Sequence, residues 1–119
     1  MEEKSVKPDT LVVLWTSGDK EVATKMAFMY TRNAKLKGWW KDVTLIVWGP
    51  SAKLLTEQSE LQDRIEEMRA SGVVLLACKA CSDSYGVSEG LEKLGGEVKY
   101  MGEPFTQILK DPHQVIITL

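Results

Sequence analysis

Apolar runs alternate along the chain with amphipathic stretches, and this pattern predicts strands that alternate with helices. Residues 10–16, TLVVLWT, are aliphatic and β-branched, which favours a buried strand. Within residues 20–37 the apolar positions recur at spacings of three and four, which predicts a helix. Gly38 then stands where a helix commonly ends in left-handed backbone. The first part of the chain is therefore one strand–helix unit.

The same alternation continues to the end of the sequence. Ser59 and Gln62 have the spacing of a capping box, which predicts that Ser59 caps a helix that ends before Gly72. Shorter helices are expected from about residue 52, at residues 105–110, and in two segments after residue 78, the second capped by Ser88. Further strands are predicted at residues 42–48, 73–77, 97–101 and 114–119.

Near-continuous apolar strands between helices are typical of a mostly parallel sheet that helices cover on both faces, which is an α/β architecture. Residues 11–15 and 73–77 are expected to be central strands with almost no solvent exposure. The pattern gives neither the strand order nor the direction of the last strand, which stays open as parallel or antiparallel.

The composition narrows the class of protein. One domain is predicted at residues 10–119, after a flexible tail of residues 1–9. Fifteen Lys and Arg against 17 Asp and Glu give a net charge of −2, and their dispersion argues against binding to nucleic acid or to a membrane surface. Without a membrane span or a signal-peptide core, the chain is expected in the cytoplasm. No glycine-rich nucleotide motif is present, so no cofactor is expected.

The candidate chemistry centres on Cys78 and Cys81, the only two cysteines, in the segment VVLLACKACSDSYGV. In a parallel α/β sheet, ligands bind beyond the carboxyl ends of the strands, where several strand-to-helix loops meet. Three such loops are expected here. Their candidate catalytic residues are Cys78 and Cys81, and their candidate binding residues are Thr16, Ser17, Gly49, Pro50, Ser51 and Lys79.

A helix that begins at Cys78 would favour the thiolate through free backbone N–H groups and the positive end of the helix dipole, with added charge from Lys79. Cys78 is then expected to open to the cleft and to react before Cys81, one turn further along the helix. The alternative is that both cysteines only pack, because cysteine is among the most buried residue types.

Two other cysteine chemistries fit the sequence less well. A Cys-x-x-Cys pair near a βαβ pattern suggests a thioredoxin-like oxidoreductase, but in that fold the motif comes early, whereas here two strand–helix units precede it. A structural zinc site needs four ligands, and only His113 remains as a further nitrogen ligand, so no metal is expected.

Large aromatic residues near the predicted loops indicate contacts between subunits, because they are unlikely all to fit one small core. We therefore expect a homo-oligomer. The aromatic residues expected to contribute are Trp39, Trp40, Tyr85 and Phe105.

Three segments together resemble one known family. They are VTLIVWGPSAKLL, ELQDRIEEMRASGVVLLACKACSDSYGV and LEKLGGEVKYMG, and they are similar to the DsrE/DsrF-like proteins, with the strand-to-cysteine segment of residues 72–86 as the most specific part. The resemblance extends over residues 10–119. It implies a three-layer α/β/α sandwich with a five-stranded sheet, assembled as trimers or hexamers.

The resemblance also implies a function. In the sulfur-relay members, a cysteine after a central strand accepts persulfide sulfur and passes it to a cysteine of a partner protein, and Cys78 matches that position. The leading hypothesis is therefore a sulfur carrier with a sulfur-donor or sulfur-acceptor protein as partner. The alternatives are an oligomeric module that binds a small ligand or a protein, and a redox role for Cys78 with Cys81.

Overall fold

The structure is a computed structural model that describes residues 6–119, so that residues 1–5 of the predicted tail lie outside the described residues. It contains a five-stranded sheet in the order β4-β3-β2-β1-β5, and every neighbouring pair of strands is parallel. The prediction of a largely parallel sheet is confirmed, and the open direction of the last strand is settled as parallel. The strands are β1 (Thr10–Trp15), β2 (Asp42–Val47), β3 (Val74–Cys78), β4 (Glu97–Lys99) and β5 (Gln114–Thr118).

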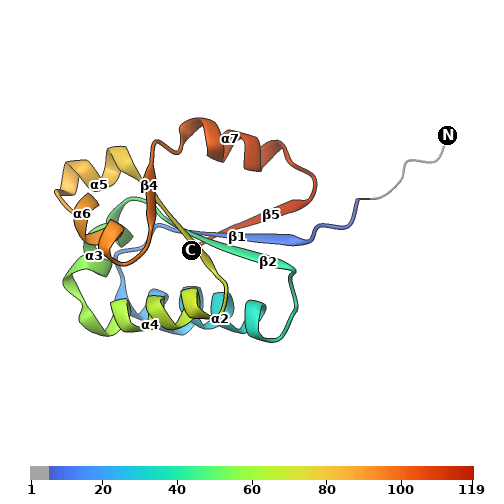
Figure 1. Ribbon diagram of the computed structural model, residues 1–119, viewed down its shortest axis with the longest axis horizontal. Helices are drawn as coiled ribbons and strands as arrows, with labels where there is room; N and C mark the ends of the chain where they lie inside the picture. The colour runs from blue at the N-terminus through green and yellow to red at the C-terminus, as the bar shows by residue number, and fades with distance from the viewer. Residues whose placement is uncertain (1–5) are drawn as a thin grey trace.

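Helices cover both faces of the sheet, as predicted for a three-layer sandwich (Figure 1). The chain passes from β1 to β4 in one direction and then crosses back to β5 beside β1. Because such crossovers are right-handed, the helix before β5 lies on the face opposite to the earlier ones. The helical segments are α1 (Lys20–Val22), η1 (Ala23–Ala27), α2 (Phe28–Leu36), α3 (Pro50–Glu57), α4 (Ser59–Ala70), α5 (Lys79–Tyr85), α6 (Ser88–Lys93) and α7 (Gly102–Lys110).

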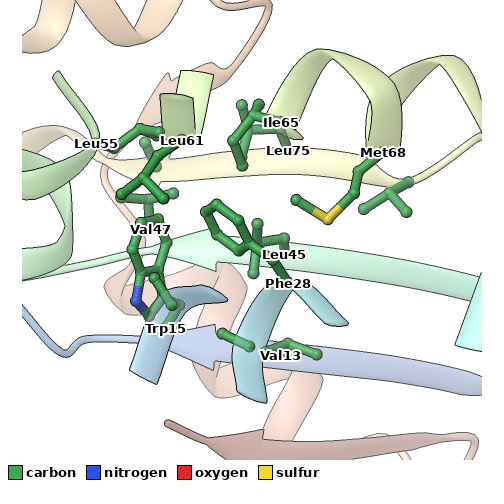
Figure 2. Packing of buried hydrophobic residues seen from close by; sticks show 14 of the residues in the cluster. Val13, Trp15, Phe28, Leu45, Val47, Leu55, Leu61, Ile65, Met68 and Leu75 are labelled. Atoms are coloured by element: carbon green, nitrogen blue, oxygen red, sulfur yellow. The ribbon is translucent and has the colours of Figure 1, made fainter. Parts of the chain in front are cut away.

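The larger core lies between the sheet and α2 and α4, which run side by side beneath it (Figures 1 and 2). Alternate residues of each strand point to this face, for example Val13 and Trp15. The Trp15 ring meets the edge of Phe28 with centroids 4.8 Å apart, and Figure 2 shows both among the leucines of neighbouring elements. Burial of each such side chain stabilises the fold by about 1.5–3 kcal/mol.

A smaller core lies on the opposite face, which we call the α7 side. Its buried members are Val12, Ile46, Leu76, Cys78 and Met101, with Trp48, Phe105 and Ile108 packed around them. Apart from Cys81 of α5, α7 supplies the helix residues that pack on this face, and α7 has no fully buried residue. The core on the α7 side is therefore thin.

The two strands expected in the centre are interior strands, since β1 lies between β2 and β5, and β3 lies between β2 and β4. The expectation of almost no solvent exposure is wrong for two residues, because Val74 is 50% exposed and Leu14 is only partly buried. By strand alternation Val74 shares the face of Leu76, so it points to the α7 side. Helix α7 leaves it uncovered.

The predicted capping box at Ser59 is also wrong. Gln58 is the N-cap of α4, and Ser59 already lies inside the helix. The Gln62 amide donates instead to the carbonyl oxygens of Leu55 and Thr56, at 3.1 and 3.3 Å. Only one residue separates α3 from α4, so Gln62 satisfies the end of the preceding helix. Similarly, Val87 rather than Ser88 is the N-cap of α6.

Within the part of the chain that the structure describes, no helix is both long and apolar enough to cross a membrane.

Candidate functional site

The strand order brings the three predicted loops to one edge of the sheet, because β1, β2 and β3 are neighbours and parallel. The loops after β1 and β2 touch directly: the Ser51 backbone N–H donates to the Thr16 carbonyl at 3.1 Å. A side chain at Gly18 would come within 3.2 Å of Pro50. The loop after β3 joins them through the packing of α5 against α3.

Cys78 lies where the chain changes from one face of the sheet to the other. After β3 the chain leaves through α5 to α6, whose Leu91 belongs to the larger core, whereas after the neighbouring β4 it leaves toward α7 on the opposite face. A crevice forms at such a switch point in open α/β sheets, and ligands bind there. Cys78, paired with Lys99 in the sheet, is the last residue of β3 at this switch point, where the architecture predicts a crevice.

Cys78 is the last residue of β3 and the N-cap of α5, but its side chain caps no backbone group. Strand alternation turns it to the α7 side, together with Leu76, where it is only 4% exposed. The expectation that Cys78 opens to the cleft is therefore wrong for this conformation. Cys81 is half-buried against the same cluster, and both thiols are free.

Met101 is the member of this cluster that comes from outside the central strands. It is the N-cap of α7 and is 1% exposed. The other buried members belong to β1, β2 and β3, so Met101 is the member that the start of α7 adds to the cluster containing Cys78. The sequence offered no signal for this role, since the contact depends on β4 lying beside β3.

The positive charge of Lys79 is paired within its own helix, α5. Its ammonium group pairs with the Asp83 carboxylate at 2.7 Å, and Asp83 also accepts from the Ser88 hydroxyl at 2.5 Å. The hydrogen bond that Lys79 donates to Asp83, with desolvation opposing it, raises the pKa of Lys79. The hydrogen bonds from Lys79 and then Ser88 lower the pKa of Asp83. Asp83 therefore links Lys79, the first residue of α5, to Ser88, the first residue of α6.

The exposed Tyr100 ring stands on the β4 side of the crevice. The Lys79 ammonium lies 5.7 Å from the centre of the ring, within range of a cation–π interaction. Lys79 and Tyr100 thus flank the crevice from the ends of β3 and β4. Sequence reasoning selected Lys79 but missed Tyr100, because their proximity depends on the strand order.

Ser51, predicted to bind a ligand, is fully buried and contacts backbone instead. Its hydroxyl donates to the Trp15 carbonyl at 2.5 Å, and it also accepts from the Trp48 backbone N–H at 3.3 Å. The hydroxyl therefore joins the ends of β1 and β2. Gly49, the N-cap of α3, has a positive φ of 80°, and Pro50 occupies the first turn of that helix.

Thr16 and Ser17 are half-buried at the end of β1, beside the end of β5. The Thr16 backbone N–H donates to the Leu119 carbonyl at 2.7 Å, and the Ser17 hydroxyl accepts from the Asp19 backbone N–H at 3.1 Å. No hydrogen bond among residues 6–119 joins either side chain to Cys78. Of the predicted binding residues, Lys79 therefore lies nearest to Cys78 along the chain and on the crevice.

Cysteine, histidine and carboxylate side chains of the described residues form no group of three that could hold a metal ion.

Comparison with known proteins adds the family context. The model of the DsrE/DsrF-like family matches residues 9–116. The solved structure of a conserved protein of unknown function from Bacteroides thetaiotaomicron is similar, with a TM-score of 0.89 and 39% sequence identity over 93% of this chain and 95% of that chain. A search of curated proteins finds no match.

Proposed function

Since the chain belongs to the DsrE/DsrF-like family, we propose that it is a small cytoplasmic sulfur carrier that accepts persulfide sulfur on Cys78. The observation that supports this most is the position of Cys78 at the switch point between β3 and β4. That crevice is where an open α/β sheet binds its ligands. Family membership alone supports only the fold and the broad class.

The proposed step transfers one sulfur atom from a donor persulfide to the Cys78 thiolate. The Cys78 thiolate attacks the outer sulfur of a donor persulfide, R–S–SH; a new S–S bond forms on Cys78 and the donor S–S bond breaks. The donor leaves as the thiolate R–S⁻, so no external oxidant or reductant is needed. A thiolate of an acceptor protein then attacks the outer sulfur and restores the Cys78 thiolate.

The burial of Cys78 fits the holding stage of this cycle. A persulfide enclosed by Met101 and the strand residues is shielded from other thiols that would release its sulfur as sulfide. The loading and unloading stages need this cover to open. Because Met101 begins α7, movement of that helix start is the proposed opening.

Intact-mass measurement tests the proposal directly. The purified protein is incubated with glutathione persulfide, and the mass of the chain is compared with that of Cys78→Ser and Cys81→Ser. We expect a gain of one sulfur atom in the wild type and in Cys81→Ser, and no gain in Cys78→Ser. The Cys81→Ser variant is the matched control, since it removes the other thiol of the same helix turn.

Each other result has a defined meaning. A gain lost only in Cys81→Ser would assign the acceptor role to Cys81 and overturn the proposal. Loss of two hydrogens in the wild type, without added sulfur, would indicate a disulfide and favour the redox role of Cys78 with Cys81. No adduct in the folded protein would favour the binding module.

A second candidate function is a homo-oligomeric module, a trimer or hexamer, that binds a small ligand or a protein. The incomplete cover on the α7 side supports self-association, because Val74 and Leu109 are exposed there. Of the aromatic residues expected at subunit contacts, Trp40 and Phe105 pack within the subunit against Tyr30 and Trp48. Trp39 and Tyr85 are exposed.

A further inference from the structure

A second apolar surface lies across the sheet from Cys78, on the outer side of η1 and α2. Met26, Met29 and Trp39 are 52%, 48% and 56% exposed. They belong to a cavity of about 230 Å³, which we call the methionine–tryptophan hollow. Its lining residues are Lys25, Met26, Met29, Tyr30, Asn33 and Trp39. Clustered exposure of large apolar side chains marks interaction sites in proteins.

The Trp39 wall of the hollow is held in place by the backbone. Gly38, with φ of 67°, ends the helix in left-handed conformation, and the Trp39 N–H donates to the Ala34 carbonyl at 3.1 Å. This is the Schellman arrangement, which turns the following residue back toward the helix. The Trp39 ring accordingly lies 5.9 Å from the Tyr30 ring. The hollow is thus preformed.

A hydrogen bond between two side chains also holds the Tyr30 ring in place. The Trp40 indole N–H donates to the Tyr30 hydroxyl at 3.2 Å, which orients the Tyr30 ring. Met26 and Met29 supply the floor from adjacent turns of the helix. Methionine side chains adapt their shape to an inserted group. Aromatic rings held in place beside adaptable methionine side chains suit the burial of a partner's side chain.

The segment that carries the hollow is basic, although the whole chain is acidic and Lys20 of this segment pairs with Glu60 of α4. Residues 20–41 carry six Lys and Arg and one Glu, a net charge of +5, whereas the whole chain has a net charge of −2. Lys25 lines the hollow, and the Lys37 ammonium lies 5.8 Å from the centre of the Trp39 ring. Neither lysine forms an ion pair with another residue of the described chain. Both charges are available to a partner.

We propose that the methionine–tryptophan hollow docks an acidic segment of another protein. An apolar side chain of that segment enters between Met29 and Trp39, and its carboxylates meet Lys25 and Lys37. Complementary charge steers such a contact and selects the partner. The hollow is smaller than the 300–1,000 Å³ typical of small-molecule pockets, which favours a single inserted side chain.

A second copy of this chain fits the hollow less well. Two hollows face to face would bring the lysines of both copies together, which is repulsive. The docking surface is also independent of sulfur transfer, because η1 and α2 lie on the opposite face of the sheet from Cys78. Failure of either proposal therefore leaves the other intact.

The test uses two synthetic amphipathic helical peptides with the same leucine and phenylalanine positions, one with glutamate and one with lysine at every polar position. Each is titrated into the full-length, isotope-labelled protein at low ionic strength while backbone amide shifts are recorded. We expect the glutamate peptide alone to bind, with the largest shifts at residues 25–33 and at Trp39. Binding should weaken with added salt.

Variants locate the contact. Lys25→Glu with Lys37→Glu should weaken binding of the glutamate peptide by about tenfold or more, since two attractive charges become repulsive. Lys53→Glu with Lys110→Glu makes the same change in net charge on exposed lysines elsewhere and should have little effect. Met29→Ala should weaken binding, whereas Leu109→Ala, an exposed apolar residue of α7, should not.

Three results would overturn the proposal. The first is equal binding of both peptides, or of neither, in the folded protein. The second is a Met29→Ala variant that loses self-association seen by light scattering, which would assign the hollow to a second copy. The third is binding to phosphatidylglycerol vesicles while the glutamate peptide shifts no amide of the hollow. If the Lys25→Glu, Lys37→Glu variant loses that vesicle binding, the hollow would be assigned to an anionic membrane surface.

Discussion

Met101, the residue before α7, belongs to the same buried cluster as Cys78, the residue before α5. The cysteine comes from β3 and the methionine follows β4, so their meeting depends on the pairing of those two strands. We therefore expect a residue from the next strand–helix connection to limit access to the Cys78 sulfur.

Met101→Ala is expected to increase the rate at which a maleimide alkylates Cys78. The truncation removes most of a side chain that is 1% exposed and opens the cover over the sulfur. It should also lower the free energy of unfolding by about 2–5 kcal/mol. Peptide mapping by mass spectrometry after timed labelling measures the rate at each cysteine.

Met68→Ala is the matched control, since Met68 is equally buried but belongs to the larger core on the other face. It should cost similar stability without exposing Cys78. Met101→Leu should keep the cover, because such swaps cost less than about 1.5 kcal/mol. Equal acceleration in the Met68 and Met101 alanine variants would show that general loosening, rather than the cover, limits access.

Ser51→Ala is expected to lower the free energy of unfolding by about 1 kcal/mol, because the buried hydroxyl loses its hydrogen bond to the Trp15 carbonyl. Sulfur uptake should be unchanged, since this hydroxyl contacts backbone rather than the crevice. Urea denaturation and the intact-mass assay measure the two effects. Ser71→Ala, at an exposed hydroxyl bonded to Glu67, is the control and should be close to neutral. A stable Ser51 variant that fails to take up sulfur would restore Ser51 as a binding residue.

Asp83→Asn is expected to destabilise the protein most near neutral pH. Its pKa in the folded protein is lowered from 3.8 by Lys79 and Ser88, so the ion pair stabilises the fold above that value. The contribution is lost as the pH falls through the lowered pKa. The difference in free energy of unfolding between wild type and variant should therefore shrink on acidification.

Urea denaturation over a pH series provides the measurement for Asp83. Asp63→Asn, on the exposed side of α4 without an ion pair to any described residue, is the control for loss of one negative charge. A difference for Asp83→Asn that grows toward acid pH would contradict the assigned sign.

Leu109→Glu is expected to convert a trimer or hexamer to smaller species, if the α7 side forms the subunit contact. Leu109 is 61% exposed, so the charge costs little in the free subunit and much in a buried interface. Light scattering at micromolar concentration reports the mass. Leu36→Glu is the control, because it makes the same replacement at an exposed leucine of α2, and it should leave the assembly intact. A monomeric wild type would remove the oligomer from the proposal.

The strands could be predicted from the sequence because their apolar runs are local. Their order could not, since no local pattern records that β5 pairs with β1 or that β4 pairs with β3. The sequence also indicated the three loops that the structure places at one edge of the sheet, and their role as a ligand site stays a prediction. The switch point, Tyr100 and Met101 emerge only from the strand order.

A shift of one residue accounts for the wrong expectation about Cys78. The strand was predicted to end at residue 77, which would place Cys78 at the start of the following helix, with its sulfur open to the cleft. It instead includes Cys78, and alternation along the strand then fixes the direction of the sulfur. Helix propensity could not supply that boundary, because Cys78 is both the last strand residue and the N-cap of α5.

The pairing of β1 with β5 has a consequence for biosynthesis. β1 is translated first among the strands and acquires its second neighbour last, when residues 114–118 have left the ribosome. Until then an interior strand has an open edge, and pairing between such distant segments is slow. Until residues 114–118 are available, one edge of β1 therefore stays open, and closing that edge is expected to be a late step of folding.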